Sequence, residues 1–343
     1  MRALVLEAPG QLEHGDRPRV GVLPPGHARA RVRRVGICGT DWHAFAGRQP
    51  FFTYPRVLGH ELGVEVTEVA SDVSSLSVGD RCAVEPYLHC GDCIACRRGR
   101  TNCCERLQVL GVHIDGGMAG EIVVPAAKLH PSASLPFEAL ALVETLAIGR
   151  HAVTRAAPEA GEAALVLGAG PIGLSTLPFL REAGCRVFVA DVSTDRLRTA
   201  KAVAEVDGVL DATGDLPATL RERLDGELPT IVIDATGNRE SMRRSVELLA
   251  ATGRLVYVGL VLGDVAFDDP SFHKRETTLL ASRNALPGDF KAIIKLIEAG
   301  RVDTGPWITH RCTSGELPDA LSTWRDGERP VLKAIIDFDG GAA

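Results

Sequence analysis

Several cysteines crowd into a short segment, and thiolates at such spacing can hold a metal ion. Cys90, Cys93 and Cys96 are each separated by two residues, and the adjacent pair Cys103 and Cys104 follows. The short connections let three sulfurs converge on one zinc ion at about 2.3 Å, and either residue of the pair can supply the fourth. Four thiolates leave no open coordination position, so the predicted site is structural and stabilises a lobe over about residues 88–106. A redox Cys-x2-Cys pair would explain only two of these cysteines.

A glycine pattern forms the second candidate site. Gly168-Ala169-Gly170-Pro171-Ile172-Gly173 follows a predicted strand and opens a predicted helix. The first glycine permits a tight turn, the second lets a pyrophosphate approach the backbone, and the third allows close helix–strand packing. Asp191 ends the next predicted strand, where a carboxylate accepts from the ribose hydroxyls of NAD and repels a 2′-phosphate. The pattern therefore predicts NAD rather than NADP. A glycine-rich turn without a ligand would leave Asp191 unexplained.

Three further positions are weaker candidates for contacts with the dinucleotide. Thr236 and Gly259 follow later predicted strands, and the carboxyl ends of strands in an open α/β sheet line the cofactor crevice. Each nearby glycine could equally serve a plain turn. Arg196 lies one helical turn beyond Asp191; we favour a solvated helix residue there and keep it as a candidate contact.

The surrounding elements change character near Arg150. Residues 1–148 predict short strands and loops, because turn signals recur among β-branched runs such as 63–69. Beyond that point, predicted strands (163–167, 186–190, 230–234 and 254–258) alternate with predicted helices (171–183, 194–203 and 241–250). This alternation indicates βαβ units and a parallel sheet. Helices at 289–299 and 317–325 then precede an apolar strand at 334–338, which we expect to return to the N-terminal domain.

Composition excludes several other classes of protein. A length of 343 residues suggests two domains. The net charge of −6 and the lack of a basic patch interleaved with aromatics argue against nucleic acid as a partner. No run of eighteen apolar residues suggests a membrane span. Nine cysteines, an odd number, and no secretory signal argue against a disulfide framework and favour a cytoplasmic location.

Three more motifs link the metal and nucleotide patterns to a known family. They are Gly36-Ile37-Cys38-Gly39-Thr40-Asp41-Trp42-His43, Leu58-Gly59-His60-Glu61-Leu62-Gly63 and Leu142-Val143-Glu144. In this order, with the cysteine lobe and the glycine motif, they resemble the zinc-dependent medium-chain alcohol dehydrogenase superfamily over nearly the whole chain. The resemblance implies an α/β fold. It places a GroES-like β-rich catalytic domain at 1–149, a doubly wound Rossmann domain at 150–286 and a return to the catalytic domain at 287–343. It also favours Cys104 as the fourth thiolate.

The resemblance further implies a catalytic zinc in the cleft between these domains. Carried over to this chain, Cys38 and His60 are zinc ligands, while Glu61 and Glu144 complete or adjust the shell. The Glu144 carboxylate would bind the zinc or hold its water. Mixed sulfur, nitrogen and oxygen ligands with one exchangeable position are typical of a catalytic zinc, which acidifies a bound hydroxyl. Thr40, the cofactor ribose and His43 would then relay the proton to solvent.

The family branch suggests the substrate. Glu144 and residues 49–55 resemble the sorbitol, threonine and sugar-acid branch, including galactonate- or gulonate-type 5-dehydrogenases. Thr145 stands where many relatives carry proline. The expected activity is NAD-linked oxidation of a secondary hydroxyl of a small polyol or sugar acid. Arg283 is expected to pair with a substrate carboxylate or the cofactor. The alternative is that it forms an ion pair between the domains. The resemblance implies a homotetramer or a dimer.

Other functions remain open at this stage. Within the fold, threonine or a cyclitol could be the substrate. A zinc-free NADPH-dependent quinone reductase would lack the thiolate lobe and the Cys38 and His60 ligands. A non-catalytic NAD-binding protein would not need retained ligands and relay groups.

Overall fold

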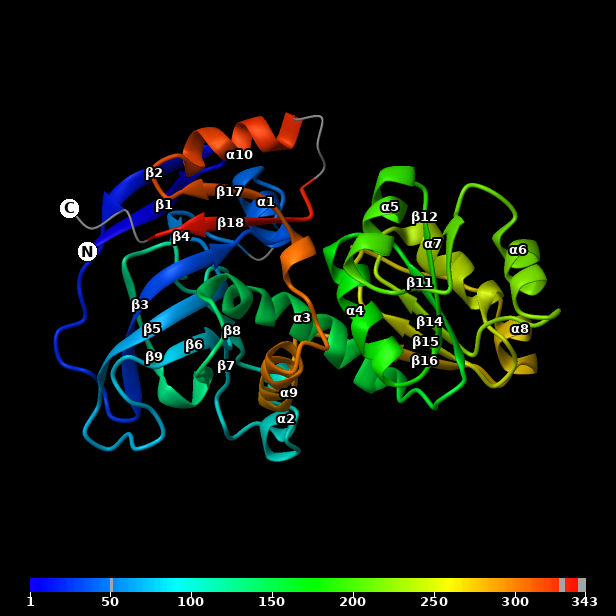
Figure 1. Cartoon of the computed structure of the whole chain (residues 1–343), viewed down its shortest axis with the longest axis horizontal. Helices are drawn as coiled ribbons and strands as arrows, with labels where there is room; N and C mark the ends of the chain where they lie inside the picture. Colours follow the sequence, from blue (N-terminus) through cyan, green and yellow to red (C-terminus); the bar gives the residue numbers. More distant parts are fainter. Residues whose placement is uncertain (50–51, 327–330, 339–343) are drawn as a thin grey trace. The chain divides into compact units, whose positions relative to one another are not determined.

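The chain folds into two compact units, seen in a computed structural model that describes residues 1–49, 52–326 and 331–338 (Figure 1). One unit comprises Met1–Glu144 and Leu286–Ala343, and the other comprises Thr145–Ala285. Pro50 and Phe51, part of the segment that suggested a substrate branch, lie outside the described residues. The first unit is therefore assembled from two separate stretches of sequence.

The first unit is built on β-sheets. Its largest sheet has the order β10-β6-β5-β3-β18-β17, with β9 also paired to β3. These strands are β3 (His27–Gly36), β5 (Glu61–Val69), β6 (Arg81–Val84), β9 (Glu121–Pro125), β10 (Leu129–Ser132), β17 (Ile308–Thr313) and β18 (Lys333–Asp337). A smaller sheet, β2-β1-β4, contains β1 (Arg2–Ala8), β2 (Gln11–Asp16) and β4 (Arg56–Val57), and β7 (Tyr87–Leu88) pairs with β8 (Gln108–Val109). The antiparallel pairing of β18 with β3 ties the C-terminal stretch to this unit.

Helices complete this unit, and one of them corrects the sequence prediction. They are α1 (Gly39–Phe45), α2 (Ile94–Arg97), α9 (Pro287–Glu298) and α10 (Leu317–Asp326). In addition, α3 (Phe137–Ala156) runs across the boundary between the units, where strands and loops were predicted up to residue 148. Its first half is buried almost all round, so it carries no polar stripe to reveal a helical period. The prediction of an all-β segment was wrong at this point.

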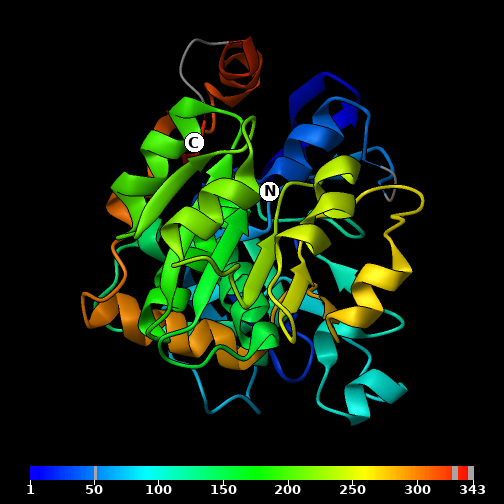
Figure 2. The same ribbon diagram turned by 90° about the vertical axis from the view of Figure 1, so that its right-hand side faces the viewer.

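The second unit is an open parallel sheet with helices on both faces (Figure 2). Its order is β13-β12-β11-β14-β15-β16, with every pair parallel. The strands are β11 (Ala163–Leu167), β12 (Arg186–Asp191), β13 (Gly208–Asp211), β14 (Ile231–Asp234), β15 (Arg254–Tyr257) and β16 (Thr278–Ala281). The helices are α4 (Pro171–Glu182), α5 (Thr194–Val203), α6 (Leu216–Arg223), α7 (Arg239–Arg244) and α8 (Asp269–Lys274). Counted from β11, this is the 3-2-1-4-5-6 order of a Rossmann fold.

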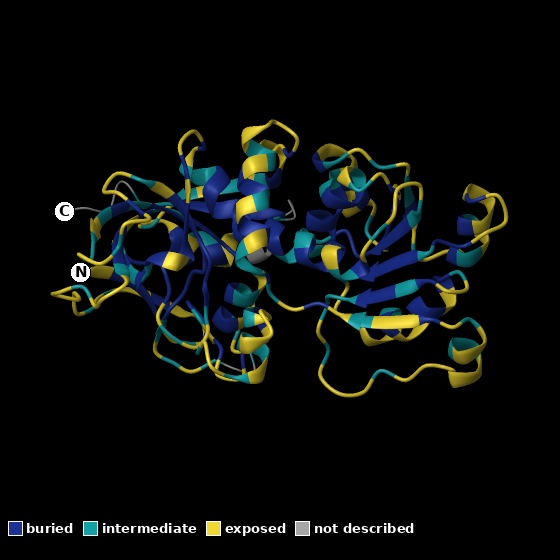
Figure 3. Cartoon of the chain, turned by 90° about the horizontal axis from the view of Figure 1, so that it is seen from below, coloured by how far each residue is buried: buried dark blue, intermediate teal, exposed yellow. Residues whose placement is uncertain are grey.

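Burial explains which strands the sequence revealed. The central strands β11 and β14 are buried along almost their whole length, whereas the edge strand β16 is largely exposed (Figure 3). Continuous apolar runs mark strands covered on both faces, so the central strands were predicted and β13 and β16 were missed.

Within the described part of the chain, no helix has the length and apolar character needed to cross a membrane.

Candidate metal centres and dinucleotide site

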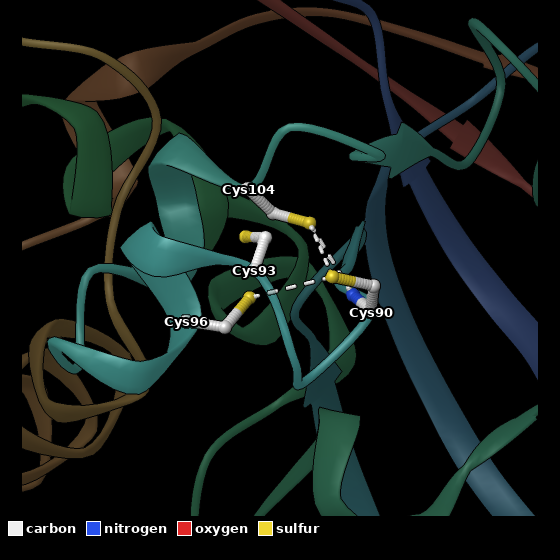
Figure 4. Close-up of side chains that lie close together, drawn as sticks. All are labelled: Cys90, Cys93, Cys96 and Cys104. Atoms are coloured by element: carbon white, nitrogen blue, oxygen red, sulfur yellow. Dashed lines mark hydrogen bonds between the residues drawn. The ribbon is translucent and has the colours of Figure 1, made fainter.

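Four cysteine sulfurs face a common space in the lobe between β7 and β8 (Figure 4). The ligand atoms of Cys90, Cys93, Cys96 and Cys104 all lie within 4.8 Å of one another. The Cys90 sulfur is 3.4 Å from that of Cys104 and 3.9 Å from that of Cys96. Sulfurs at the corners of a zinc tetrahedron stand about 3.8 Å apart. The donor set therefore fits a four-thiolate zinc ion, and Cys103 is exposed outside it.

Backbone N–H groups donate to two of the sulfurs in this lobe, those of Cys104 and Cys93. The backbone N–H groups of Cys90 and Arg106 both donate to the Cys104 sulfur at 3.3 Å. Backbone N–H groups of Cys96 and Glu105 lower the pKa of Cys93 to about 6. Between residues 89 and 106 only Asn102 and Cys104 are buried. Because apolar burial is so slight, a metal held by the four sulfurs would supply stability that the lobe's own core does not.

A second group of ligand atoms lies at the ends of two central strands of the large sheet, β3 and β5. Cys38, His60 and Glu61 offer one sulfur, one nitrogen and one oxygen, all within 4.8 Å of one another. Cys38 is the N-cap of α1 just after β3, and His60 immediately precedes β5, which begins at Glu61. The pairing of Gly36 with Glu61 brings these two motifs together across the sheet. A Cβ at Gly36 would lie only 2.3 Å from a Glu61 carboxylate oxygen. Any residue larger than glycine at position 36 would therefore displace the carboxylate.

Asp41 supports both of the first two ligands, and its role was not predicted. It is buried, and its Oδ2 accepts a hydrogen bond from the Cys38 backbone N–H at 2.9 Å. Its Oδ1 lies 3.8 Å from His60 Nδ1, and neither atom has a hydrogen-bond partner. A histidine that binds a metal usually presents its second ring nitrogen to a carboxylate. Two buried polar atoms facing each other in this way fit a metal ion on the other side of the ring.

The charges around His60 act in the same direction. Burial alone would lower the pKa of His60, but the negative charges of Asp41 and Cys38 raise it well above its ordinary value. The charge of Glu144 adds to this effect. Acidic side chains and a thiol thus surround His60, a donor set that suits a divalent cation.

Lys333 is the buried counter-charge of Glu61. Its Nζ donates to Glu61 Oε1 and lies 3.4 Å from the Ile37 carbonyl. The two charged side chains are 2% and 1% exposed. Burial alone would lower the pKa of Lys333, but Glu61 and then Cys38 raise it, so the amine stays charged. The sequence carried a signal for this pair, because a lysine beside the apolar run of β18 can be buried only with a partner of opposite charge.

Glu144 lies near this group but outside it. Its carboxylate does not belong to the set of ligand atoms within 4.8 Å and instead accepts a hydrogen bond from the Tyr87 hydroxyl. Both side chains are buried. Burial, and next the negative charge of Glu144, raise the pKa of Tyr87 well above its ordinary value, so the hydroxyl keeps its proton and donates. Tyr87 was not among the predicted site residues.

The two predicted relay residues both lie on α1. Thr40 is half-buried, and His43, three residues later, is exposed. Residues three apart are neighbours on a helix surface. From Thr40 to His43, the side chains on this face of α1 thus pass from half-buried to exposed.

The glycine motif joins β11 to α4 in the second unit. Gly168 has a φ of +93°, which a residue with a side chain rarely adopts. A Cβ at Gly173 would lie 1.8 Å from the Gly168 carbonyl oxygen, so α4 can pack here only with glycine. Gly170 is the N-cap of α4, Pro171 and Ile172 begin its first turn, and the free N–H groups of that turn can receive a phosphate.

Asp191 ends β12 beside this turn. Its Oδ2 accepts from the Ala169 N–H at 2.7 Å and its Oδ1 from the Ser193 N–H at 2.8 Å. These bonds fix a buried carboxylate whose remaining lone pairs can accept ribose hydroxyls. Arg196 is exposed, with its guanidinium 3.8 Å from Asp191. This distance is too long for a hydrogen bond.

The remaining predicted contacts also follow strands of this sheet. Thr236 is exposed beyond β14 and donates from its hydroxyl to Asp234 at 2.6 Å. Gly259 follows β15 and packs so closely on Gly237 that a Cβ would lie 2.4 Å from the Gly237 nitrogen. Arg283 follows β16 and is exposed. All three thus lie at the carboxyl ends of parallel strands.

Known proteins match both units. The Alcohol dehydrogenase GroES-like domain family matches residues 24–135, and the Zinc-binding dehydrogenase family matches residues 171–299. The chain is 40% identical to L-galactonate-5-dehydrogenase of Escherichia coli (strain K12), with 98% of this chain and 99% of that protein covered. It is 34% identical to D-altritol 5-dehydrogenase of Agrobacterium fabrum, with 87% and 88% covered.

A solved structure agrees with these matches. The crystal structure of the rspB alcohol dehydrogenase of E. coli CFT073, complexed with NADH, superimposes with a TM-score of 0.91 at 29% identity. The match covers 98% of this chain and 99% of that one. With such similarity along its whole length, the chain belongs to the zinc-dependent medium-chain alcohol dehydrogenase family, whose members combine a GroES-like domain with a Rossmann domain, and it is an oxidoreductase of that family.

Proposed function

We propose that this protein oxidises a secondary hydroxyl of an acyclic sugar acid or polyol, with NAD as the hydride acceptor. The observation that carries the proposal is the convergence of Cys38, His60 and Glu61 on one space. Three protein ligands of mixed type leave a fourth position for a substrate. Zinc bound there would act as a Lewis acid on the substrate hydroxyl.

The relatives indicate the substrate class. Their names describe 5-dehydrogenases of L-galactonate and of D-altritol, one a sugar acid and the other a neutral polyol. In an open six-carbon chain, C5 carries a secondary hydroxyl in both. We therefore assign the reaction of this chain to the C5 hydroxyl of an acyclic six-carbon substrate. Arg283 is the candidate partner of a substrate carboxylate or of the cofactor.

The chain's own residues would then handle the proton and the cofactor. Thr40 is half-buried two residues after Cys38, so its hydroxyl can accept the proton of the substrate alcohol while giving its own to the cofactor ribose, and the exposed His43 can pass a proton on to solvent. Asp191 selects NAD, because a carboxylate accepts from two ribose hydroxyls and repels a phosphate. Asp41 and Lys333 hold His60 and Glu61 in place.

A homo-oligomer, either a dimer or a tetramer, is part of the proposal. The edge strand β16 leaves its backbone open on one side, and Leu279 on that strand is exposed. Leu260 and Leu262 are also exposed, in the segment that follows β15. Open edges with apolar side chains favour pairing with another chain.

The decisive experiment combines metal analysis with a substrate panel. We expect about two zinc ions per chain. With NAD, kcat/KM should be highest for an aldonate or hexitol, and the product should be the 5-ketone. Preferred turnover of threonine, a cyclitol or a quinone would contradict the substrate class, and one zinc or none would contradict the catalytic site. Comparing Arg283→Ala on an aldonate and on a hexitol tests the carboxylate contact, which equal losses would exclude.

A further inference from the structure

The buried hydrogen bond between Tyr87 and Glu144 belongs neither to the three converging ligands nor to the proton relay. Glu144 is a buried residue of α3, and its negative charge contributes to the raised pKa of His60. The carboxylate nevertheless stays outside the ligand atoms, where its Oε1 accepts from the Tyr87 hydroxyl. A buried carboxylate near a divalent cation is itself a competent ligand. Whether the Glu144 carboxylate binds the metal therefore depends on what holds its side chain.

Tyr87 is held rigidly enough to fix the position of the Glu144 carboxylate. Its ring is buried and meets Phe290 of α9 edge-on, with the ring centroids 6.3 Å apart. Phe290 is fully buried and also stacks on His130, with centroids 5.1 Å apart. The Tyr87 backbone is fixed by the pairing of β7 with β8. The hydroxyl thus projects from a rigid platform, and the flexible partner in the hydrogen bond is the Glu144 side chain.

We propose that Tyr87 is a positioning residue that keeps the Glu144 carboxylate out of the coordination sphere of the zinc. The hydroxyl holds Glu144 at a fixed distance from Cys38, His60 and Glu61. The fourth coordination position then stays open for the substrate hydroxyl. This inference rests on the zinc site of the proposed function.

The expected effect follows from the hydrogen bond that is lost. A hydrogen bond to a charged group favours one position of that group by a factor of about ten or more. In Tyr87→Phe the ring and its contact with Phe290 remain, but nothing retains the carboxylate. Glu144 is then free to swing toward the ion and occupy the open position. The variant should bind its metal more tightly and in a higher coordination number.

Two measurements on the metal-loaded protein test this without reference to turnover. The first is the rate at which zinc passes to an excess of a colorimetric chelator; the phase lost in His60→Ala belongs to the Cys38 site. We expect Tyr87→Phe to slow this phase about tenfold. The second is the visible spectrum after cobalt exchange into the same site, which should shift from a four-coordinate to a five-coordinate form. Tyr257→Phe is the matched control, because that hydroxyl donates to the Met242 carbonyl in the other unit and should change neither reading.

The same substitution made in a Glu144→Gln protein distinguishes the proposed role of Tyr87 from a purely structural one. Glutamine at position 144 is a poor metal ligand, so Tyr87→Phe should have no effect on either reading in a Glu144→Gln protein. A wild-type rate and spectrum for Tyr87→Phe would overturn the inference, as would an undiminished effect in the Glu144→Gln background. Metal analysis distinguishes the two proposals. Fewer than two zinc ions in the wild-type chain refutes the proposed function, whereas two ions with an unchanged Tyr87→Phe refutes only the role of Tyr87.

Discussion

Replacing Lys333 by methionine should destabilise the first unit far more without zinc than with it. Methionine is unbranched and only one atom shorter than lysine, and it removes the charge. In the native protein Lys333 and Glu61 are almost completely buried and contact each other directly. Removing one partner of such a pair leaves an uncompensated charge in the interior and costs about 3–5 kcal/mol. That is a large share of a typical stability of about 5–15 kcal/mol.

Bound zinc should reduce this cost, because a carboxylate beside a cation is no longer uncompensated. The remaining loss should be about 1.5–3 kcal/mol, which is the contribution of one hydrogen bond to a charged group. Urea unfolding followed by tryptophan fluorescence measures both values. All three tryptophans, Trp42, Trp307 and Trp324, belong to the first unit, so this signal reports that unit alone. The measurement is made on the zinc-loaded protein and after removal of metal by a chelator.

A double variant supplies the control. Lys333→Met combined with Glu61→Gln removes both charges, so the metal-free double variant should be more stable than the sum of the two single losses predicts. Equal destabilisation by Lys333→Met with and without zinc would refute the argument that Glu61 shares its charge with the metal. Strict additivity in the double variant would refute the ion pair as the cause.

Two further predictions concern the cysteine lobe and a charged cluster of the second unit. Cys104→Ser should reduce the metal content to about one zinc per chain, whereas Cys103→Ser should keep about two; the reverse would assign the fourth thiolate to Cys103. Burial by itself raises the pKa of Glu162, but hydrogen bonds from the Glu159 backbone and from side chains including that of Arg254 lower it overall. The stabilisation is therefore present above the unfolded pKa of about 4.3 and is lost as the pH falls through the folded pKa. Glu162→Gln should cost about 1 kcal/mol at neutral pH in urea unfolding followed by circular dichroism, which also reports the second unit, and progressively less below about pH 4; a loss that does not depend on pH would contradict this assignment.

The sequence revealed the parts of the molecule that depend on local patterns. The glycine motif requires its residue types within a single turn, and the cysteine spacing encodes convergence within one short lobe. The central strands of the parallel sheet also appeared as apolar runs. By contrast, α3 was missed because burial on all sides removes the polar stripe on which helix prediction depends.

The residues that escaped prediction act through contacts that are distant in sequence. Tyr87 meets Glu144 across 57 residues, and Lys333 meets Glu61 across 272. Only the completed sheet and the docking of α3 bring these pairs together. Asp41 is different, because it lies three residues from Cys38 and could have been recognised as an acidic residue buried in the first turn of a helix.

The pairing of β18 with β3 has a consequence for the order of events during synthesis. Lys333 leaves the ribosome 272 residues after Glu61, which is on the order of 10 to 60 s of translation. The whole of Thr145–Ala285 is made in that interval and can complete its own sheet. Meanwhile Glu61 lacks its cation and the C-terminal end of β3 lacks its partner strand β18, so the nascent first unit presents an open strand edge beside a group of metal ligands. Early capture of zinc or protection by a chaperone would matter most in this window, when the ligands exist and their counter-charge does not.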